Sequence, residues 1–248
     1  MVEIKLEHAS VEFSVYNARS RSLRGDLMKR VGGHIGRSVK DDRVVIHALR
    51  DITLDLKAGT RLALVGHNGA GKSTMLHLLG GVYEPSSGSA RIEGKVSSLL
   101  NLSMGMDPER TGRDNIVLRA AFLGMKLTEA KALVPEIAEF SELGPYLDLP
   151  MRTYSSGMAM RLGFGVSTAI QPDIILMDEM ISVGDARFAT KARARLQKMM
   201  ERAGILVIAS HSSDTLRQYC DRALWLKEGR IIADGPLEDI LAQAHRPD

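Results

Sequence analysis

The fold of this chain is decided by one stretch of sequence, Gly66-His67-Asn68-Gly69-Ala70-Gly71-Lys72-Ser73-Thr74. It contains the pattern G-x-x-x-x-G-K-[ST], whose glycines let backbone N–H groups close around phosphate oxygens that a Cβ would keep out. In this pattern the lysine reaches the β- and γ-phosphates, and the serine hydroxyl binds Mg²⁺. The apolar run before it, Arg61 to Val65, suits a buried strand, and helical character follows it as far as Leu79. This strand–loop–helix context predicts a nucleoside triphosphate site formed by all nine residues.

Composition narrows the class of protein. The 33 basic and 30 acidic residues give a net charge of +3, which is too mild to indicate a nucleic-acid partner. Aromatic residues make up 4% of the chain, so no base-stacking platform is evident. The single cysteine, Cys220, fits a reducing compartment. No apolar run approaches the roughly 18 residues of a spanning helix, and the N-terminus lacks a signal-peptide core. We therefore expect a soluble, cytoplasmic protein without a nucleic-acid partner.

Hydrophobic patterning predicts an α/β fold. Residues 2–15 and 49–56 alternate apolar and polar side chains, which indicates a partly antiparallel β layer near the N-terminus. Residues 107–149 change to helical spacing. Two buried-strand candidates, 174–177 and 205–209, flank a helical segment, and such a βαβ unit implies a parallel sheet.

Residues 17–46 fit none of these elements and form an insertion. Between 17 and 43 it carries three acidic residues and eight basic ones, namely Arg19, Arg21, Arg24, Lys29, Arg30, Arg37, Lys40 and Arg43. One interpretation is a solvated surface excursion. The other is a basic amphipathic helix, lying at the lipid headgroups or against the cytoplasmic ends of a membrane partner.

Three side chains after predicted strands have the chemistry to act on a triphosphate. Asp178 and Glu179 follow a buried strand at the end that faces the ligand crevice of a parallel sheet. Asp178 suits the Mg²⁺ shell, and Glu179 suits a general base or the group that orients water. His211 follows the neighbouring strand, where its ring N–H would contact the γ-phosphate. The alternatives are an acidic helix start and a structural histidine.

The segment Tyr154 to Met158 opens a helix with Ser155, Ser156 and Gly157. Small hydroxyl residues and glycine at a helix N-terminus cap its free N–H groups and favour anions. Its place in the order of motifs, after the phosphate loop and shortly before Asp178, makes it a second candidate phosphate contact.

At this point the sequence resembles the ATP-binding subunit of ABC transporters over nearly the whole chain. Gly66 to Ser73 is similar to the Walker A motif, and Ile174 to Asp178 to the Walker B motif, with Glu179 as the catalytic glutamate. Ser182 to Asp185 looks like the D-loop, and His211 looks like the switch histidine. The resemblance implies a P-loop NTPase core of ABC ATPase type with an antiparallel β layer and a helical subdomain.

The resemblance also implies a homodimer arranged head to tail, with ATP and Mg²⁺ sandwiched between two subunits. The phosphate loop of one subunit would face Ser155, Ser156 and Gly157 of the partner subunit, and Asp185 would lie at the same site. Ser73 and Asp178 would hold the Mg²⁺. The implied domain organisation is a single ABC ATP-binding domain over 1–248, with the insertion at 17–46 and a helical subdomain at about 102–168.

Two departures from the family pattern narrow the function. Tyr154 to Met158 differs from the L-S-G-G-Q signature at three of five positions, and no glutamine occurs between Ser73 and Ser155. The glutamine of the usual Q-loop is therefore missing, and Asn101, within Ser97 to Gly105, is the candidate substitute as a metal contact.

Both departures resemble the subfamily that exports O antigen, capsule or teichoic acid. That resemblance implies ATP-driven export of a lipid-linked polysaccharide through an integral membrane partner, with this subunit peripheral on the cytoplasmic face of the inner membrane. The chain ends 37 residues after His211, so we expect no C-terminal carbohydrate-binding domain. The alternatives are a subunit of a drug or lipid exporter, and a nucleotide-gated binding module without turnover.

An aromatic side chain near the end of the first strand is expected to stack on the adenine. Val11, Phe13 and Val15 share the face that is predicted to be core, whereas Tyr16 falls on the other face at the exit of the strand. Tyr16 is therefore the preferred adenine contact, and Phe13 is the alternative.

Overall fold

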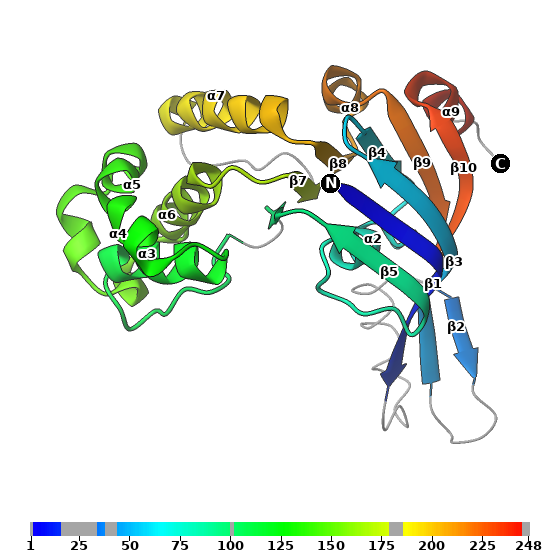
Figure 1. Ribbon diagram of the computed structural model, residues 1–248, viewed down its shortest axis with the longest axis horizontal. Helices are drawn as coiled ribbons and strands as arrows, with labels where there is room; N and C mark the ends of the chain where they lie inside the picture. The colour runs from blue at the N-terminus through cyan, green and yellow to red at the C-terminus, as the bar shows by residue number, and fades with distance from the viewer. Residues whose placement is uncertain (1, 16–33, 38–43, 100–101, 179–185, 245–248) are drawn as a thin grey trace. The chain divides into compact units, whose positions relative to one another are not determined.

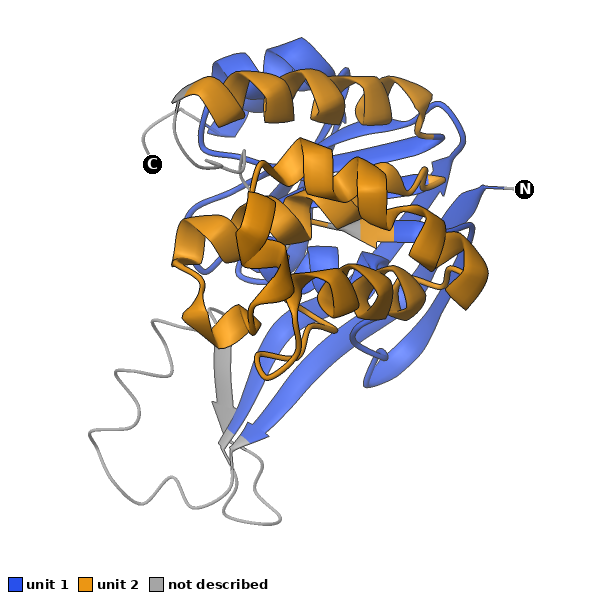
Figure 2. Cartoon of the chain, turned by 90° about the vertical axis from the view of Figure 1, so that its left-hand side faces the viewer, with its two compact units in different colours: residues 1–96, 174–180, 204–248 blue, residues 97–173, 181–203 orange. Residues whose placement is uncertain are grey.

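The computed structural model describes residues 2–15, 34–37, 44–99, 102–178 and 186–244 (Figure 1). The chain forms two compact units (Figure 2). Unit 1 comprises residues 1–96, 174–180 and 204–248, and unit 2 comprises residues 97–173 and 181–203. Within the described ranges, no helix is both long and apolar enough to cross a membrane.

Unit 1 contains the predicted antiparallel layer. Its four strands run in the order β2-β3-β1-β5, and every neighbouring pair is antiparallel. The core of the layer comes from the apolar positions of the alternating pattern, since Ile4 and Leu6 pair with Leu56 and Leu54 and all four are buried. The strands are β1 (Glu3–Val15), β2 (His34–Arg37), β3 (Val44–Lys57) and β5 (Ser87–Glu93).

The second sheet has the strand order β10-β9-β4-β8-β7-β6, and the five strands that lie in unit 1, β10 to β7 in this order, are mainly parallel. Its central strands are apolar from Leu62 to Val65 in β4 and along the whole of β8, which is typical of parallel strands buried on both faces. Only β10 pairs antiparallel, closing a hairpin with β9. The strands are β4 (Arg61–Val65), β7 (Ile174–Asp178), β8 (Ile205–Ala209), β9 (Arg222–Lys227) and β10 (Arg230–Pro236). A further strand, β6 (Val96–Ser98), spans the boundary between the units.

Three helices of unit 1 lie among its described residues, and the first of them positions the phosphate loop. Helix α2 (Lys72–Leu79) begins directly after Gly71, whose left-handed φ of 107° turns the chain from the loop into the helix. The other two helices, α8 (Ser213–Tyr219) and α9 (Leu237–Ala244), flank β9 and β10 at the carboxyl end of the chain.

Unit 2 is helical and has its own apolar core, which includes Ile116, Ile137, Leu147, Leu162 and Val166. Its elements are α3 (Gly112–Phe122), α4 (Leu127–Ala132), α5 (Val134–Ser141), the 3₁₀ helices η1 (Gly144–Asp148) and η2 (Met151–Thr153), α6 (Ser156–Ala169) and α7 (Ala186–Arg202).

Unit 2 extends beyond the predicted helical range of about 102–168 because it includes α7. Helix α7 packs on α5 through the rings of Phe188 and Phe140, 5.3 Å apart, and through a 2.6 Å ion pair between Arg195 and Glu136. The boundaries given from the sequence remain a prediction. The apolar pattern showed α7 as a helix but did not show which unit it joins.

Candidate active site

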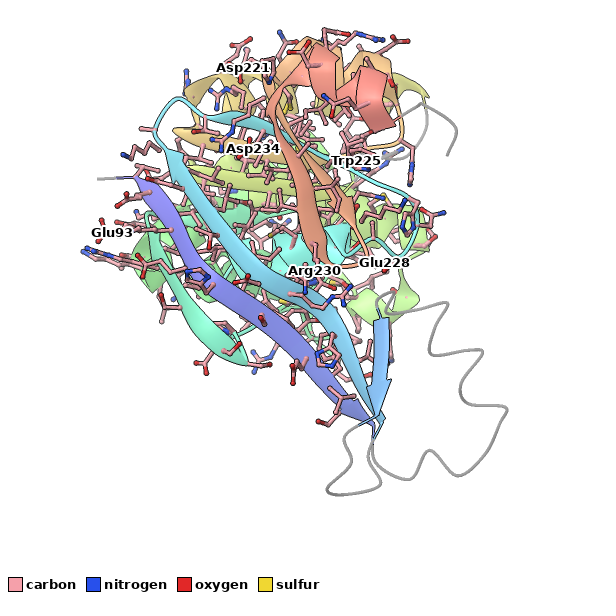
Figure 3. All side chains as sticks on the ribbon, turned by 90° about the vertical axis from the view of Figure 1, so that its right-hand side faces the viewer. Glu93, Asp221, Trp225, Glu228, Arg230 and Asp234 are labelled. Carbon is pink, nitrogen blue, oxygen red and sulfur yellow. The ribbon has the colours of Figure 1, made fainter. Side chains whose placement is uncertain are left out.

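The phosphate loop lies between β4 and α2 and depends on glycine at both ends. Gly66 has φ 154°, and a Cβ there would lie 2.4 Å from the backbone oxygen of Leu226. A Cβ on Gly71 would lie 3.0 Å from the backbone oxygen of Ala48. The turn between β9 and β10 also contacts the loop, since the N–H of Gly229 donates a 3.0 Å hydrogen bond to the carbonyl of Ala70. Glu228 and Arg230, on either side of Gly229, are labelled in Figure 3. Neighbouring backbone therefore fixes the shape of the loop.

Lys72 lies inside this loop and is nearly buried, with 9% of its surface exposed. Its Nζ donates hydrogen bonds to the carbonyl oxygens of Gly66, at 2.6 Å, and of His67, at 3.1 Å. The ammonium group is thus held at the centre of the loop by neutral acceptors. A phosphate oxygen is a stronger acceptor for this cation than a carbonyl, so the position suits binding of a triphosphate.

Ser73 and Asp178 meet at the carboxyl end of the parallel sheet. The Oγ of Ser73 donates a 2.6 Å hydrogen bond to Oδ2 of Asp178, which joins the start of α2 to the end of β7. One turn further along α2, Nδ1 of His77 donates to the carbonyl of Ser73 at 2.7 Å. A hydroxyl and a carboxylate are the hard oxygen ligands that Mg²⁺ prefers, so this pair fits the metal predicted from the sequence.

His211 is exposed and lies just after β8, in the same unit as the phosphate loop. It lines a cavity of about 340 Å³ that reaches the first residues of the loop. Its lining includes Gly66, His67, Ser210, His211, Trp225 and Lys227. Trp225 projects from β9 (Figure 3). His211 therefore shares this cavity with the first residues of the loop, and its contact with the γ-phosphate stays a prediction. Nothing in the sequence indicated the contribution of Trp225, since it reads as part of a strand.

The signature segment begins α6 in unit 2. Oγ of Ser155 accepts a 3.2 Å hydrogen bond from the N–H of Met158, which is the geometry of an N-cap. The hydroxyl of Tyr154 donates to the carbonyl of Tyr146 at 2.7 Å, and burial raises the pKa of Tyr154. A cavity of about 470 Å³ beside the helix start is lined by residues that include Ser155 and Gly157. The predicted second phosphate contact therefore sits at an open helix N-terminus.

The aromatic side chain named as the alternative adenine contact already has packing partners. Phe13 meets the ring of Tyr83 edge-on, with the centroids 5.4 Å apart. Tyr83 in turn lies 5.0 Å from the ring of His77 on α2. Phe13 therefore belongs to an aromatic cluster that reaches His77 on α2.

Several predicted site residues lie outside the described part of the chain, and their roles stay predictions. These are the preferred adenine contact, the catalytic glutamate, the D-loop aspartate and the Q-loop substitute, namely Tyr16, Glu179, Asp185 and Asn101. The basic insertion is likewise outside it, apart from β2 and residues 44–46.

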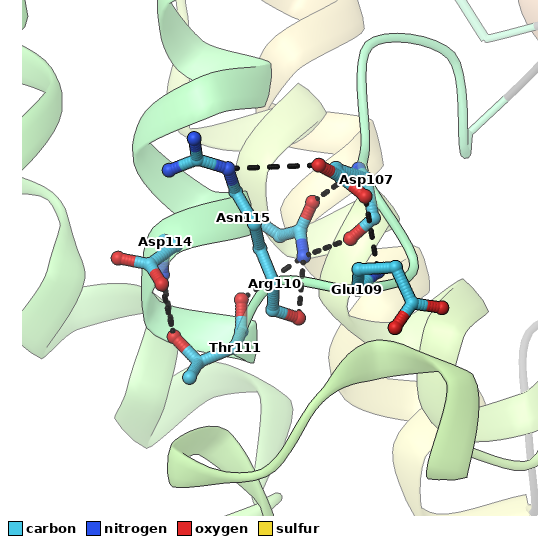
Figure 4. A network of polar contacts seen from close by, with 6 residues as sticks. All are labelled: Asp107, Glu109, Arg110, Thr111, Asp114 and Asn115. Atoms are coloured by element: carbon cyan, nitrogen blue, oxygen red, sulfur yellow. Dashed lines mark hydrogen bonds and ion pairs between the residues drawn. The ribbon is translucent and has the colours of Figure 1, made fainter.

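Two buried polar residues of α3 have contacts that the sequence did not indicate. Asn115 is fully buried; its side chain accepts from the N–H of Asp107 at 2.7 Å and donates to the carbonyls of Asp107, Arg110 and Thr111 (Figure 4). Arg119, one turn later, is 1% exposed. Their spacing in the sequence could have indicated that they are buried. Residues four apart share one face of a helix, and the face of α3 that carries Asn115 and Arg119 also carries apolar residues.

Comparison with known proteins places these features in a family. A family model described as ABC transporter matches residues 49–182. The chain is 43% identical over 235 residues to the O-antigen export system ATP-binding protein RfbE of Yersinia enterocolitica, covering 94% of this chain and 98% of that protein. It is 38% identical to RfbB of Klebsiella pneumoniae, an O-antigen export system ATP-binding protein, over 84% of this chain and 89% of that one. It is 35% identical to the teichoic acids export ATP-binding protein TagH of Lactococcus lactis, and the matched region covers 98% of this chain but 50% of TagH.

Solved structures show the same fold. An ATP-binding subunit of an ABC transporter matches with a TM-score of 0.68 at 23% identity, covering 98% of this chain and 93% of that one. A dimeric ATP-binding cassette in a post-hydrolysis state with ADP and Pi matches with a TM-score of 0.65 at 20% identity, covering 94% and 98%. At these identities the likeness supports the fold alone, and the predicted fold class is confirmed.

Proposed function

Because this chain belongs to the ABC transporter family, we propose that it is the ATP-hydrolysing subunit of a membrane exporter for a lipid-linked polysaccharide, such as O antigen, capsule or teichoic acid. The observation that carries the cargo class is the similarity to O-antigen export subunits, at 43% identity over 98% of one such protein. The missing Q-loop glutamine and the basic insertion agree with it, since both are features that distinguish this sequence from the general family pattern.

ATP binding rests on the phosphate loop and Lys72. The loop N–H groups and the positive end of α2 attract the β- and γ-phosphates. Lys72 would exchange its hydrogen bonds with the carbonyls of Gly66 and His67 for stronger ones with phosphate oxygens. Ser73 and Asp178 would hold Mg²⁺, which when bound neutralises charge on the phosphates. Glu179 would take a proton from the attacking water, and His211 would contact the γ-phosphate.

The complete site would need two copies of the chain. Ser155 begins a helix in unit 2, with free N–H groups suited to an anion, while the phosphate loop lies in unit 1. In the proposed head-to-tail homodimer, each ATP contacts the loop of one subunit and Ser155, Ser156 and Gly157 of the partner subunit. Asp185 would lie at the same interface. ATP binding would close the dimer, and hydrolysis would reopen it.

The proposed complex sits at the cytoplasmic face of the inner membrane, where this subunit is peripheral and held by an integral membrane partner. The insertion at 17–46 is the proposed contact with that partner or with lipid headgroups. Replacing Arg21, Arg24 and Arg30 with Ala should therefore lower transport more than basal hydrolysis. The matched control replaces three exposed cations of α7, Arg193, Lys198 and Arg202, with Ala. If both sets of substitutions lower transport equally, or if the substitutions in the insertion do not lower it, the insertion is a solvated loop without a role in transport.

The catalytic assignment is tested by Glu179→Gln in the complete transporter. General-base catalysis contributes about 10²- to 10⁴-fold, so steady-state hydrolysis should fall by at least about 100-fold while ATP still binds. Glu84→Gln, at an exposed position with no proposed role in catalysis, is the control and should hydrolyse ATP at the wild-type rate. Hydrolysis retained in Glu179→Gln would refute the assignment of the base.

A further inference from the structure

We propose that Arg119 is a positioning residue that fixes the segment Leu102–Met106 to helix α6, so that this segment and Ser155 at the start of α6 move as one body. The inference deepens the proposed function, because Ser155 is its second phosphate contact. The segment follows directly on residues 97–101, where the Q-loop glutamine of the family is missing in this chain.

The first support is the set of hydrogen bonds that Arg119 makes from inside unit 2. Its Nε and Nη2 donate to Oγ of Ser167 on α6, at 3.1 and 2.6 Å, and its Nη1 donates to the carbonyl of Met104. One guanidinium group thus bridges α3, α6 and the backbone of the segment. Its planar fork of five donors suits such a bridge, and a lysine would not reproduce its geometry.

The second support is that Ser167 passes the contact on to the backbone of α6. Its hydroxyl donates a 2.8 Å hydrogen bond to the carbonyl of Gly163. Gly163 also lies against the segment, since a Cβ there would be 2.2 Å from the carbonyl oxygen of Leu102. The same helix that carries Ser155 at its start is therefore in direct backbone contact with the segment.

The third support is that other residues of the segment, and those that follow it, also contact α3. Gly105 has φ 80°, and a Cβ on it would lie 2.6 Å from the ring of Phe122 on α3. Asn115, four residues before Arg119 on α3, holds the next stretch through Asp107, Arg110 and Thr111 (Figure 4). Residues 102–111 are thus anchored at successive points, and Arg119 supplies the one polar bridge among these contacts that reaches α6.

Burial of the charged Arg119 side chain costs free energy, and this supports a role of Arg119 in positioning the segment Leu102–Met106. Arg119 is 1% exposed, and burial lowers its pKa to about 10, so the group still carries its charge at neutral pH. A buried charge costs desolvation free energy that a well-packed apolar residue would avoid. What an apolar residue could not do is hold the carbonyl of Met104 and the hydroxyl of Ser167 at a fixed separation.

The test compares Arg119→Met, Arg119→Lys and Arg113→Met in the complete transporter. Arg113 is the matched control, because it is an exposed arginine of the same helix that pairs with Asp148. Amide hydrogen exchange and ATP hydrolysis are measured for each protein.

In Arg119→Met, exchange should rise about tenfold at residues 103–106 and at 155–158, and should stay unchanged in the β strands of unit 1. Hydrolysis in the presence of the membrane partner should fall about tenfold, while ATP binding to the phosphate loop stays within about twofold. Arg119→Lys should show nearly the same changes in exchange and hydrolysis as Arg119→Met, and Arg113→Met should behave as wild type.

A second variant keeps the proposal testable if Arg119→Met does not fold. Ser167→Ala removes the acceptor of two Arg119 hydrogen bonds and leaves the core nearly filled. It should raise exchange at the same two stretches, and adding Arg119→Lys to it should have little further effect. Exchange that rises throughout unit 2, or a folded Arg119→Met protein with wild-type hydrolysis and exchange, would overturn the proposal. A wild-type chain that does not hydrolyse ATP would instead contradict the proposed function and leave the exchange results standing.

Discussion

Oγ of Ser73 donates a 2.6 Å hydrogen bond to Oδ2 of Asp178, a residue 105 positions further along the chain. The contact ties the first turn of α2 to the end of β7, and it places the two proposed Mg²⁺ ligands side by side. It also brings the end of the phosphate loop next to the end of β7, although most of the helical unit separates them in sequence.

Replacing Ser73 with Ala should remove the hydroxyl that this contact offers to Mg²⁺. We expect Mg²⁺-dependent ATP hydrolysis to fall by about 100-fold, which is the usual cost of losing one well-placed group at a reacting charge. Ser73→Thr keeps a hydroxyl and is the control; it should retain most of the activity. Titration of hydrolysis with Mg²⁺ checks both variants. If Ser73→Ala is as active as Ser73→Thr at low Mg²⁺, the side chain is not a metal ligand.

The close approach of Gly66 to β9 predicts a large effect of a single added methyl group. Gly66→Ala should lower the free energy of unfolding by about 2 to 4 kcal/mol, because the new Cβ would meet the backbone oxygen of Leu226. Gly59 also has a left-handed φ, at 95°, but has open space around it, so Gly59→Ala should cost only about 1 kcal/mol. Urea unfolding of the isolated chain measures both. Equal losses would show that backbone strain alone, without the clash, sets the cost at Gly66.

Phe13 and Tyr16 should respond differently to removal of the ring. Phe13→Ala should lower the free energy of unfolding, by about 2 to 4 kcal/mol for a partly buried aromatic residue, since it loses its packing on Tyr83. Tyr16→Ala should leave the stability unchanged and raise the KM for ATP by about tenfold, which corresponds to the loss of one stacking contact. Thermal unfolding and ATP-dependent kinetics separate the two effects. A raised KM in Phe13→Ala at unchanged stability would move the adenine contact to Phe13.

Cys220 should make stability depend on alkaline pH. Burial raises its pKa to about 12, while a thiol in the unfolded chain titrates near 8.5. Below about pH 8 both states are protonated, so the thiol adds no pH dependence. Above it the unfolded state releases the proton and the folded state keeps it, so the free energy of unfolding falls by about 1.4 kcal/mol per pH unit. Cys220→Ala should lack this decrease when its unfolding is compared with wild type at about pH 8 and pH 10. Parallel pH dependence of the two proteins would show that the thiol is not shielded.

The sequence predicted those parts of the molecule that local chemistry determines. The phosphate loop needs glycine at particular backbone angles, and Ser155 caps its own helix, so both could be read from a few neighbouring residues. The apolar runs of β7 and β8 on either side of a helical segment indicated a parallel sheet, because a βαβ unit joins parallel strands.

Features that depend on packing between distant segments could not be predicted in this way. Trp225 joins His211 at one cavity through the order of strands in the sheet, which no short pattern encodes. The sequence pattern did not single out Arg119, because its contacts with Met104 and Ser167 come from segments distant from it in sequence. The membership of α7 in unit 2 follows likewise from its packing on α5.

The most direct measurement is the amount of polysaccharide on the cell surface when this chain is replaced by Lys72→Ala in its native transporter, with ATP hydrolysis by the purified complex measured in parallel. Lys72 is the cation at the centre of the phosphate loop. We predict that hydrolysis is lost, that surface polysaccharide disappears and that lipid-linked polymer accumulates inside the cell. Restoration of the wild-type chain should reverse all three effects. Normal surface polysaccharide in cells that carry only the Lys72→Ala chain would contradict an ATP-driven role in polysaccharide export.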